Sequence, residues 1–263
     1  MVAVVKVGVV GAGSIGSVVA EALRDGQVPG AQLAGVVDPM LSPAGLPMCA
    51  LPELLSASDL VVEAAGQRAL ADAGPQVLSA GCDLLVVSVG ALAADGLLEK
   101  LLAAGPGAVH LSTGAIGGLD LLRSAALLGQ FERVVIETTK KASSLVQPWM
   151  SEAEAEELRQ ASAPVELRRG PAREITAAFP KSANVAASVA LAVRDWDVVE
   201  AAVIADPAAP LTSHVITAVG PAGEYRFEIR NKPSPRTPTS SQVVPFAVLS
   251  ALEALATPRA VFR

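Results

Sequence analysis

Short apolar runs alternate with longer helical patterns through the first 112 residues. The runs that predict strands are Val4–Val10, Leu33–Val37, Leu60–Glu63, Leu84–Ser88 and Ala108–Leu111. The segments between the later runs are long enough for crossover helices. This alternation is typical of α/β proteins, so we predict a Rossmann-type, doubly wound parallel sheet.

The pattern changes after the glycine-rich segment Ser112–Gly118. A helical stretch leads to an apolar strand at Arg133–Thr139, and later strands alternate with period two. In Tyr225–Asn231 the apolar side chains fall on one face and the charged ones on the other, as in a sheet with one solvated face. These features predict a second, α+β domain.

The last apolar stretch, Val243–Ala256, is helical in pattern, and we expect it to pack on the first domain. The predicted boundaries are therefore residues 1–112 with 242–263 for a dinucleotide-binding domain. Residues 113–241 would form a catalytic and dimerisation domain. A chain of 263 residues is consistent with two domains.

Composition narrows the class of protein. Hydrophobic residues make up 51% of the chain and charged residues 17%, which excludes intrinsic disorder. The net charge of −6 disfavours nucleic acid or an anionic membrane as a partner. We therefore expect a globular protein that acts on a small molecule.

Cysteine content and the longest uncharged run bear on the compartment. Cys49 and Cys82 are too few for a disulfide framework and lack metal-ligand spacing, so we expect no metal and a cytoplasmic protein. The run Leu101–Leu119 contains Pro106 and several glycines, which a membrane-spanning helix disfavours. Glycines also interrupt the first apolar segment, so no export signal is expected.

A dinucleotide site is predicted from the glycines that follow the first strand. Gly11, Gly13 and Gly16 form a G-x-G-x-x-G pattern between an apolar strand and an amphipathic helix. The first glycine permits a tight turn, the second a close approach of pyrophosphate, and the third close helix packing. Asp38 ends the next strand, where its carboxylate can accept the ribose hydroxyls. The alternative is an ordinary strand–helix turn.

The expected cofactor is NAD, because the Asp38 carboxylate would repel a 2′-phosphate, although NADP is also considered. Glu63–Gly66 and Ser88–Ala91 follow the next two strands. Their backbones are expected to line the carboxyl edge of the sheet, where a cofactor lies. The alternative is that they are small residues that form ordinary loops.

Acid–base catalysis needs a side chain whose pKa lies near physiological pH. Histidine meets this requirement, and the chain has two histidines. His110 lies within an apolar run and is expected to be structural. His214 follows a proline-rich turn at the start of a strand, where it can face a cleft, so it is the catalytic candidate.

Two further positions have open interpretations. Lys140 and Lys141 end an apolar strand and can meet a substrate carboxylate, or they form a solvated strand end. Asn184 begins an apolar helix. Either it hydrogen-bonds the nicotinamide or its ribose, or it or Ser182 caps the helix.

Five sequence blocks together resemble the L-aspartate dehydrogenase family. They are STGAIGGLDLL (112–122), ETTKK (137–141), FPKSANVAASVALA (179–192), VIADPAAPLTSH (203–214) and PSPRTPTSS (233–241). The resemblance implies oxidation of L-aspartate with NAD or NADP through iminoaspartate, which hydrolyses to oxaloacetate and ammonia or feeds NAD synthesis. It also implies a homodimer.

The resemblance assigns roles to individual residues. His214 would be catalytic, Ala115 and Asn184 would lie on the nicotinamide side, and Lys140, Thr212 and Ser240 would face the substrate. Further cofactor contacts would be Ser14, Ile15, Asp38, Ala65, Gly66, Val87 and Ser88.

The chain departs from the family pattern near the expected substrate. Ser182 and Thr212 stand where the family usually has asparagine, and Thr239 stands where it has lysine. Arg236 or Lys140 is an alternative source of that charge. The departures favour, as a second hypothesis, a dehydrogenase or reductase of another small amino or oxo acid. A third hypothesis is an inactive cofactor-binding regulator.

Overall fold

The computed structural model describes residues 4–257, which form two compact units. Unit 1 contains the described residues up to Gly114 and those from Val244 onward, and unit 2 spans Ala115–Val243. The ends of the predicted first domain, residues 1–3 and 258–263, lie outside the described residues. Each unit has its own sheet and core.

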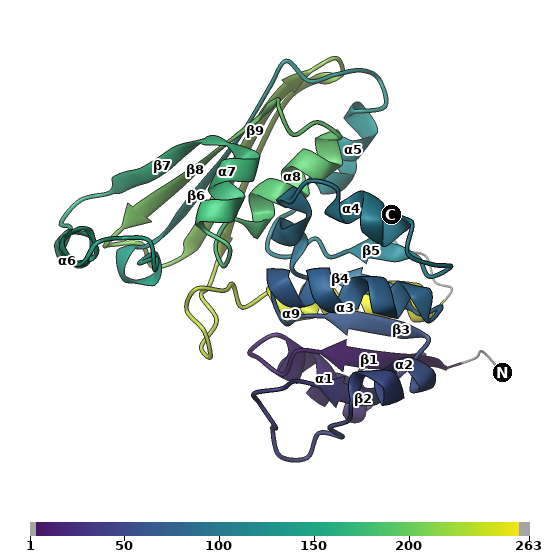
Figure 1. The fold of residues 1–263 in the computed structure, drawn as a ribbon. Coiled ribbons are helices and arrows are strands. Elements are labelled where there is room, and N and C mark those ends of the chain that lie inside the picture. Colours follow the sequence, from purple (N-terminus) through teal and green to yellow (C-terminus); the bar gives the residue numbers. More distant parts are fainter. Residues whose placement is uncertain (1–3, 258–263) are drawn as a thin grey trace. The chain divides into compact units, whose positions relative to one another are not determined.

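Unit 1 contains a five-stranded parallel sheet in the order β2-β1-β3-β4-β5 (Figure 1). This topology confirms the predicted doubly wound sheet. β4 ends two residues earlier than predicted, and a short 3-10 helix follows at Val89–Ala93. The strands are β1 (Val5–Val10), β2 (Ala31–Val37), β3 (Leu60–Glu63), β4 (Asp83–Val86) and β5 (Val109–Leu111).

Helices pack on both faces of this sheet. α1 (Gly16–Arg24) and α9 (Val244–Ala256) share a core with β1 and β3, to which α9 contributes Val248 and Leu252. Burying each such side chain contributes about 1.5–3 kcal/mol, which attaches the end of the described chain to unit 1. The remaining helices are α2 (Leu51–Ala57), α3 (Gln67–Ser79) and α4 (Leu97–Leu102).

Unit 2 contains a five-stranded mixed sheet in the order β10-β9-β6-β8-β7. β6 and β8 are parallel and the other pairs are antiparallel, as expected for an α+β unit. The strands are β6 (Arg133–Lys141), β7 (Val165–Pro171), β8 (Val199–Asp206), β9 (Thr212–Gly220) and β10 (Gly223–Asn231). The helices are α5 (Leu119–Ala125), α6 (Glu152–Gln160), α7 (Ala172–Ala178) and α8 (Asn184–Val193).

The two faces of this second sheet differ. The predicted alternation in β10 is confirmed, because Tyr225, Phe227 and Ile229 pack on the core that α5, α7 and α8 cover. The opposite face carries Arg169, which forms ion pairs with the carboxylates of Glu137, Glu166 and Glu200. Side chains on the helix-covered face are therefore the ones that burial can perturb.

No helix within residues 4–257 is long and apolar enough to span a bilayer. The uncharged run Leu101–Leu119 includes the end of α4, all of β5 and the loop before α5. Residues 4–257 also contain no cluster of three or more His, Cys, Asp or Glu side chains that could hold a metal ion.

Candidate cofactor and catalytic sites

The three glycines after β1 have distinct environments. Gly11 has φ +101°, and a Cβ there would lie 2.6 Å from the Ala64 carbonyl carbon. At Gly16 a Cβ would lie 1.8 Å from the Gly11 oxygen, whereas at Gly13 it would meet nothing within 4 Å. Gly11 and Gly16 thus allow a tight turn whose backbone lies close to neighbouring backbone atoms, and Gly13 leaves space for a ligand.

The N-terminus of α1 opens beside Gly13. Ile15 occupies the N-cap position and no side chain caps the helix. An uncapped helix N-terminus carries partial positive charge, which suits a phosphate group. With the space at Gly13, these residues fit a dinucleotide.

Asp38 follows β2 and contacts the glycine turn. Its Oδ2 accepts a hydrogen bond from the Ala12 N–H at 2.7 Å, and its Oδ1 accepts from the Met40 and Leu41 N–H groups. Partial burial alone would raise the pKa of Asp38, but the three N–H donors lower it below its ordinary value. The side chain is therefore an ionised carboxylate held beside the turn.

Glu63 ends β3 and is 1% exposed. It accepts hydrogen bonds from the N–H groups of Ala65 and Gly66 and from both the N–H and the hydroxyl of Ser88. Burial raises the pKa of this carboxyl, and the four hydrogen bonds oppose that rise. The sequence predicted Glu63 as the end of a strand and expected the backbone of Glu63–Gly66 to line the cofactor edge, but it gave the Glu63 carboxylate no role. The signal for its role was an acidic residue at the end of an otherwise apolar, buried strand.

In unit 2, His214 is the third residue of β9 and is 2% exposed. It lies opposite Thr138 of β6, and the Thr138 Oγ1 is 3.0 Å from the His214 Nδ1. Burial, and then the charge of Lys140, lower the pKa of His214 to about 3. The imidazole is therefore neutral at pH 7, and the threonine hydroxyl orients its ring.

Lys140 lies two residues beyond Thr138 on the same face of β6 and is 4% exposed. Its Nζ donates a hydrogen bond to the Thr239 carbonyl at 2.6 Å, and burial lowers the pKa of its ammonium to about 8. Within residues 4–257 no carboxylate lies within ion-pair distance of Lys140. Lys140 is thus not part of a solvated strand end, whereas Lys141 is exposed.

The segment 233–241 folds back on itself beside these strands. Pro233 and Ser241 form an antiparallel bridge, and the Ser234 N–H donates to the Ser240 carbonyl. A cavity of about 300 Å³ lies between this segment and the strand ends, lined in part by Lys141 and the buried Thr212. Unit 2 therefore brings Lys140, Thr212, His214 and the segment that contains Ser240 to one end of its sheet.

The helix-capping interpretation of Ser182 and Asn184 is wrong. Asn184 is the first residue of α8, Ala183 is its N-cap, and no side chain caps the helix. The Ser182 Oγ is buried without a hydrogen-bond partner among the described residues. Because a short loop joins α8 to β8, the N-terminus of α8 points toward the carboxyl ends of β8 and β6, the end that carries Lys140.

Other predicted residues have simpler surroundings. The Ala115 carbonyl accepts a hydrogen bond from the Asn231 side chain. In unit 1, the His110 Nε2 lies 3.1 Å from the Asp83 carboxylate, as expected of a structural histidine. Val87 and Ser88 directly follow β4.

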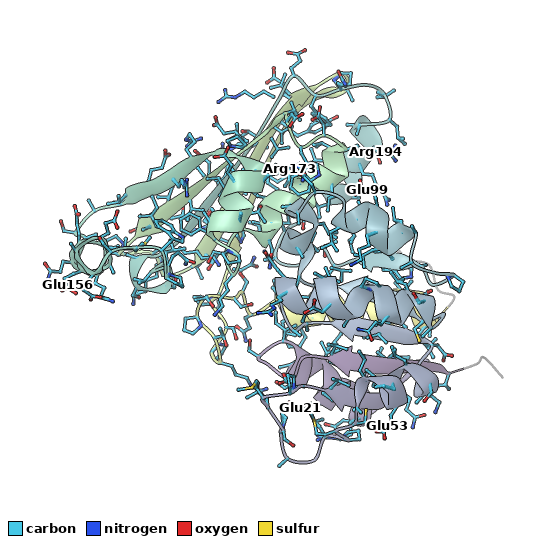
Figure 2. All side chains as sticks on the ribbon, in the orientation of Figure 1. Glu21, Glu53, Glu99, Glu156, Arg173 and Arg194 are labelled. Atoms are coloured by element: carbon cyan, nitrogen blue, oxygen red, sulfur yellow. The ribbon has the colours of Figure 1, made fainter. Side chains whose placement is uncertain are left out.

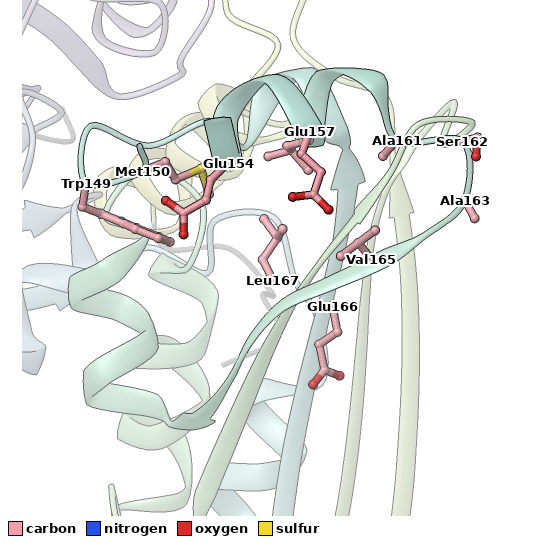
Figure 3. A pocket seen from close by; sticks show the side chains of 11 residues that line it. Trp149, Met150, Glu154, Glu157, Ala161, Ser162, Ala163, Val165, Glu166 and Leu167 are labelled. Carbon is pink, nitrogen blue, oxygen red and sulfur yellow. The ribbon is translucent and has the colours of Figure 1, made fainter. Parts of the chain in front are cut away.

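A cavity of about 400 Å³ lies in unit 2 between α6 and β7 (Figure 3). Trp149, Met150 and Leu167 contribute apolar walls, and Glu154 and Glu157 extend beside them. None of the predicted site residues lines it.

Two family descriptions match this chain. Residues 120–255 match the C-terminal domain of aspartate dehydrogenase, and residues 11–110 match the NAD-binding domain of homoserine dehydrogenase. Together they span both units.

Individual relatives agree with these matches. The L-aspartate dehydrogenase of Methanosarcina acetivorans is 33% identical over 96% of this chain and 97% of its own length. L-Aspartate dehydrogenase 2 of Bordetella pertussis is 35% identical over 94% and 95%. The crystal structure of Thermotoga maritima aspartate dehydrogenase superposes with a TM-score of 0.77 at 23% identity, covering 98% and 99% of the two chains. That likeness concerns the fold.

Proposed function

The chain belongs to the aspartate dehydrogenase family and is an NAD(P)-dependent amino-acid dehydrogenase, and we propose that its reaction is the oxidation of L-aspartate to iminoaspartate. Iminoaspartate then hydrolyses to oxaloacetate and ammonia, or it leaves the enzyme as a precursor for NAD synthesis. In this proposal unit 1 binds the cofactor, and unit 2 binds the amino acid and moves its protons.

Unit 1 would bind the cofactor mainly through its backbone. The N-terminus of α1 and the space at Gly13 accommodate the pyrophosphate, and Asp38 accepts the ribose hydroxyls. Ser14, Ile15, Ala65, Gly66, Val87 and Ser88 complete the proposed contacts. Because Asp38 is ionised, it disfavours a 2′-phosphate, so we propose that NAD is preferred over NADP. When bound, the oxidised cofactor supplies the acceptor for the hydride that leaves the substrate Cα.

Lys140 is the proposed ligand of a substrate carboxylate. A buried ammonium is expensive to desolvate, and in folded proteins it normally has a carboxylate partner. Lys140 donates to one carbonyl in the described chain, which leaves two of its three N–H donors for a ligand. This buried, incompletely paired cation beside His214 is the observation that carries the substrate assignment. Thr212 and Ser240 are proposed to line the same site.

His214 is the proposed acid–base residue. As a neutral imidazole it can take a proton from the water that attacks the imine carbon, and Thr138 holds the ring in place. A pKa near 3 makes this base weak in the unliganded enzyme. A carboxylate bound to Lys140 cancels the charge that contributes to the low pKa, so substrate binding makes His214 a stronger base. Ala115 and Asn184 are proposed to contact the nicotinamide side.

A reductive assay tests the substrate. Purified protein is supplied with NADH, ammonia and, in turn, oxaloacetate, pyruvate or 2-oxoglutarate, and NADH oxidation is followed. Oxaloacetate should give the highest kcat/KM. A better rate with a different oxo acid would favour the second candidate function, for which the departures at Ser182, Thr212 and Thr239 provide the motive. NADH binding without turnover of any oxo acid would favour a regulator.

The proposal includes a cytoplasmic homodimer. The free thiols of Cys49 and Cys82 suit a reducing compartment. The sheet face of unit 2 opposite its helices combines the Arg169 ion-pair cluster with half-buried apolar side chains, a mixture that suits an isologous contact. Light scattering after gel filtration should give twice the 26.6 kDa mass of the chain.

A further inference from the structure

Glu63 differs from the other acidic residues of the chain. Glu53 and Glu156 lie on outward faces of their helices, as Figure 2 shows, and both are exposed. Among the described residues Glu63 is the only carboxylate that is buried. A buried carboxylate costs free energy unless hydrogen bonds compensate for lost hydration, so its contacts indicate why it is tolerated.

Its hydrogen bonds join two separate loops. Oε1 accepts from the Ala65 and Gly66 N–H groups and from the Ser88 hydroxyl, each at 2.9 Å. Oε2 accepts from the Ser88 N–H at 3.1 Å. A carboxylate offers about four acceptor sites, two on each oxygen; here Oε1 accepts from three donors and Oε2 from one, so only Oε2 keeps an acceptor site. Glu63 therefore has little capacity left for a ligand.

The two loops lie where this sheet topology places a dinucleotide. β2, which follows β1 through α1, pairs with one edge of β1. β3 pairs with the other edge of β1, and β4 and β5 continue the sheet beyond β3. The carboxyl ends of β1 and β3 therefore flank the switch point, the usual ligand site in such sheets. The contact between the Gly11 turn and the Ala64 backbone shows that the β1 and β3 loops touch there.

We infer that Glu63 is a positioning residue for the cofactor. It fixes the spacing between the Ala65–Gly66 loop, which begins α3, and Ser88, which follows β4. NAD(P) then binds to backbone groups already held in place, so no ordering cost is added on binding. The inference rests on the proposed function for NAD(P) binding but not for the identity of the amino acid.

The decisive variant is Glu63→Gln, which keeps the shape of the side chain. Its amide NH₂ must face either the Ser88 N–H or the Ala65 and Gly66 N–H groups. In either orientation two hydrogen-bond donors face each other, and one of the two loops loses its hydrogen bond to residue 63. We expect the Kd for NADH, measured by fluorescence titration without substrate, to rise roughly 10-fold, equivalent to about 1.4 kcal/mol. The Kd for NAD⁺ should rise by the same factor. The KM for oxaloacetate at saturating NADH should not change.

Asp83→Asn is the matched control. Asp83 is a half-buried carboxylate that also joins two groups, the Ala108 N–H and the His110 side chain, but at the amino end of β4. Its replacement should leave the Kd for NADH unchanged, whatever it does to the melting temperature. Hydrogen exchange should be faster at the Ser88 amide, or at those of Ala65 and Gly66, in Glu63→Gln and not in Asp83→Asn.

A purely structural Glu63 would give a different result. In that case Glu63→Gln would lower the melting temperature and leave both cofactor Kd values unchanged, which would overturn the inference. A rise in Kd for NAD⁺ alone would also overturn it, because that would indicate an effect of charge on the nicotinamide ring. If Glu63→Gln does not fold, Glu63→Asp replaces it. The shorter side chain keeps the charge but cannot reach both loops, so the NADH Kd should again rise.

If no oxo acid is turned over, the proposed aspartate reaction fails, yet NADH binding still tests Glu63. If the wild-type protein does not bind NADH, both proposals fail.

Discussion

Within residues 4–257, each unit buries one acidic or basic side chain with a formal charge, and the two differ in sign and in how completely they are hydrogen-bonded. Glu63 of unit 1 accepts four hydrogen bonds from the chain, whereas Lys140 of unit 2 donates to one carbonyl. A carboxylate that accepts its hydrogen bonds from the chain, as Glu63 does, holds the surrounding backbone in place. A cation with unused donors is better explained by a ligand that completes its coordination.

The two regions are also built from different parts of the chain. In unit 1 the proposed contacts are mainly backbone groups of short loops that each follow a strand. In unit 2 they are side chains, with Thr138 and His214 separated by 76 residues and Lys140 and Thr239 by 99. The catalytic region therefore depends on strand register, and the cofactor region depends on local turns. Substitutions in the two regions should separate their effects on kcat, on substrate KM and on cofactor binding.

The largest expected effect comes from His214→Ala. Loss of an acid–base group typically lowers kcat by roughly 10²- to 10⁴-fold. The NADH affinity should be nearly unchanged, because His214 is not among the proposed cofactor contacts. His110→Gln is the control and should affect stability more than kcat. Steady-state kinetics with oxaloacetate would remove His214 from the mechanism if both variants lost the same activity.

Lys140→Met should affect the substrate and not the cofactor. Removing the proposed carboxylate ligand should raise the KM for aspartate about 10- to 100-fold, the value of a charge-assisted contact in a buried site. Lys100→Met is the control, because Lys100 is an exposed lysine of α4 in unit 1 and does not line the cavity that Thr212 lines. An unchanged KM in Lys140→Met would mean that its unused donors have no substrate partner.

The same variant should be more stable than the wild type at pH 7. Lowering the pKa of Lys140 from 10.5 to about 8 corresponds to a cost on the order of 3 kcal/mol while the ammonium is charged in both states. Between pH 8 and 10.5 the unfolded wild type binds more protons than the folded form, so wild-type stability rises with pH. The advantage of Lys140→Met should therefore shrink across that interval in urea unfolding. An advantage independent of pH would contradict this explanation.

Much of unit 1 could be predicted from sequence because its signals are local. Strand periodicity and the glycine spacing indicated the sheet and the turn, and the structure confirms the sheet. The link that Glu63 makes between two loops was not recognised, because three of its four hydrogen bonds come from the backbone N–H groups of Ala65, Gly66 and Ser88, which leave no mark in the residue pattern.

Unit 2 shows why spacing alone was insufficient. The alternation in β10 predicted a sheet correctly, but no pattern reveals that β9 lies next to β6 and places His214 opposite Thr138. The role of His214 was predicted from its position after a proline-rich turn at the start of a strand, and the family resemblance implies the same role. The burial of Lys140 was equally hidden, because a lysine at a strand end is usually solvated.

A smaller effect is expected at Asp38, where the comparison concerns cofactor choice. Asp38→Ser removes the charge that would repel a 2′-phosphate, so NADP should bind roughly 10-fold more tightly and NAD more weakly. Because Asp38 also accepts the Ala12 N–H, some loss of NAD affinity reflects a looser turn. Fluorescence titration with NADH and NADPH measures both. If Asp38→Ser changes neither the NADH affinity nor the NADPH affinity, Asp38 does not contact the ribose.

The smallest effect is expected from Thr239→Lys in the wild-type background, and its value lies in the double variant. The Thr239 carbonyl is 2.6 Å from the Lys140 Nζ, so a lysine at position 239 begins beside an ammonium already in place. Repulsion between the two should keep the KM for aspartate within about 3-fold of wild type. In the Lys140→Met background, however, the new lysine can supply the missing charge and should lower the raised KM for aspartate by about 3- to 10-fold. Thr239→Met in that same background is the control and should recover nothing. A large fall in KM from Thr239→Lys alone would show that positions 140 and 239 serve different parts of the substrate, and Lys140 would then no longer account for the carboxylate by itself.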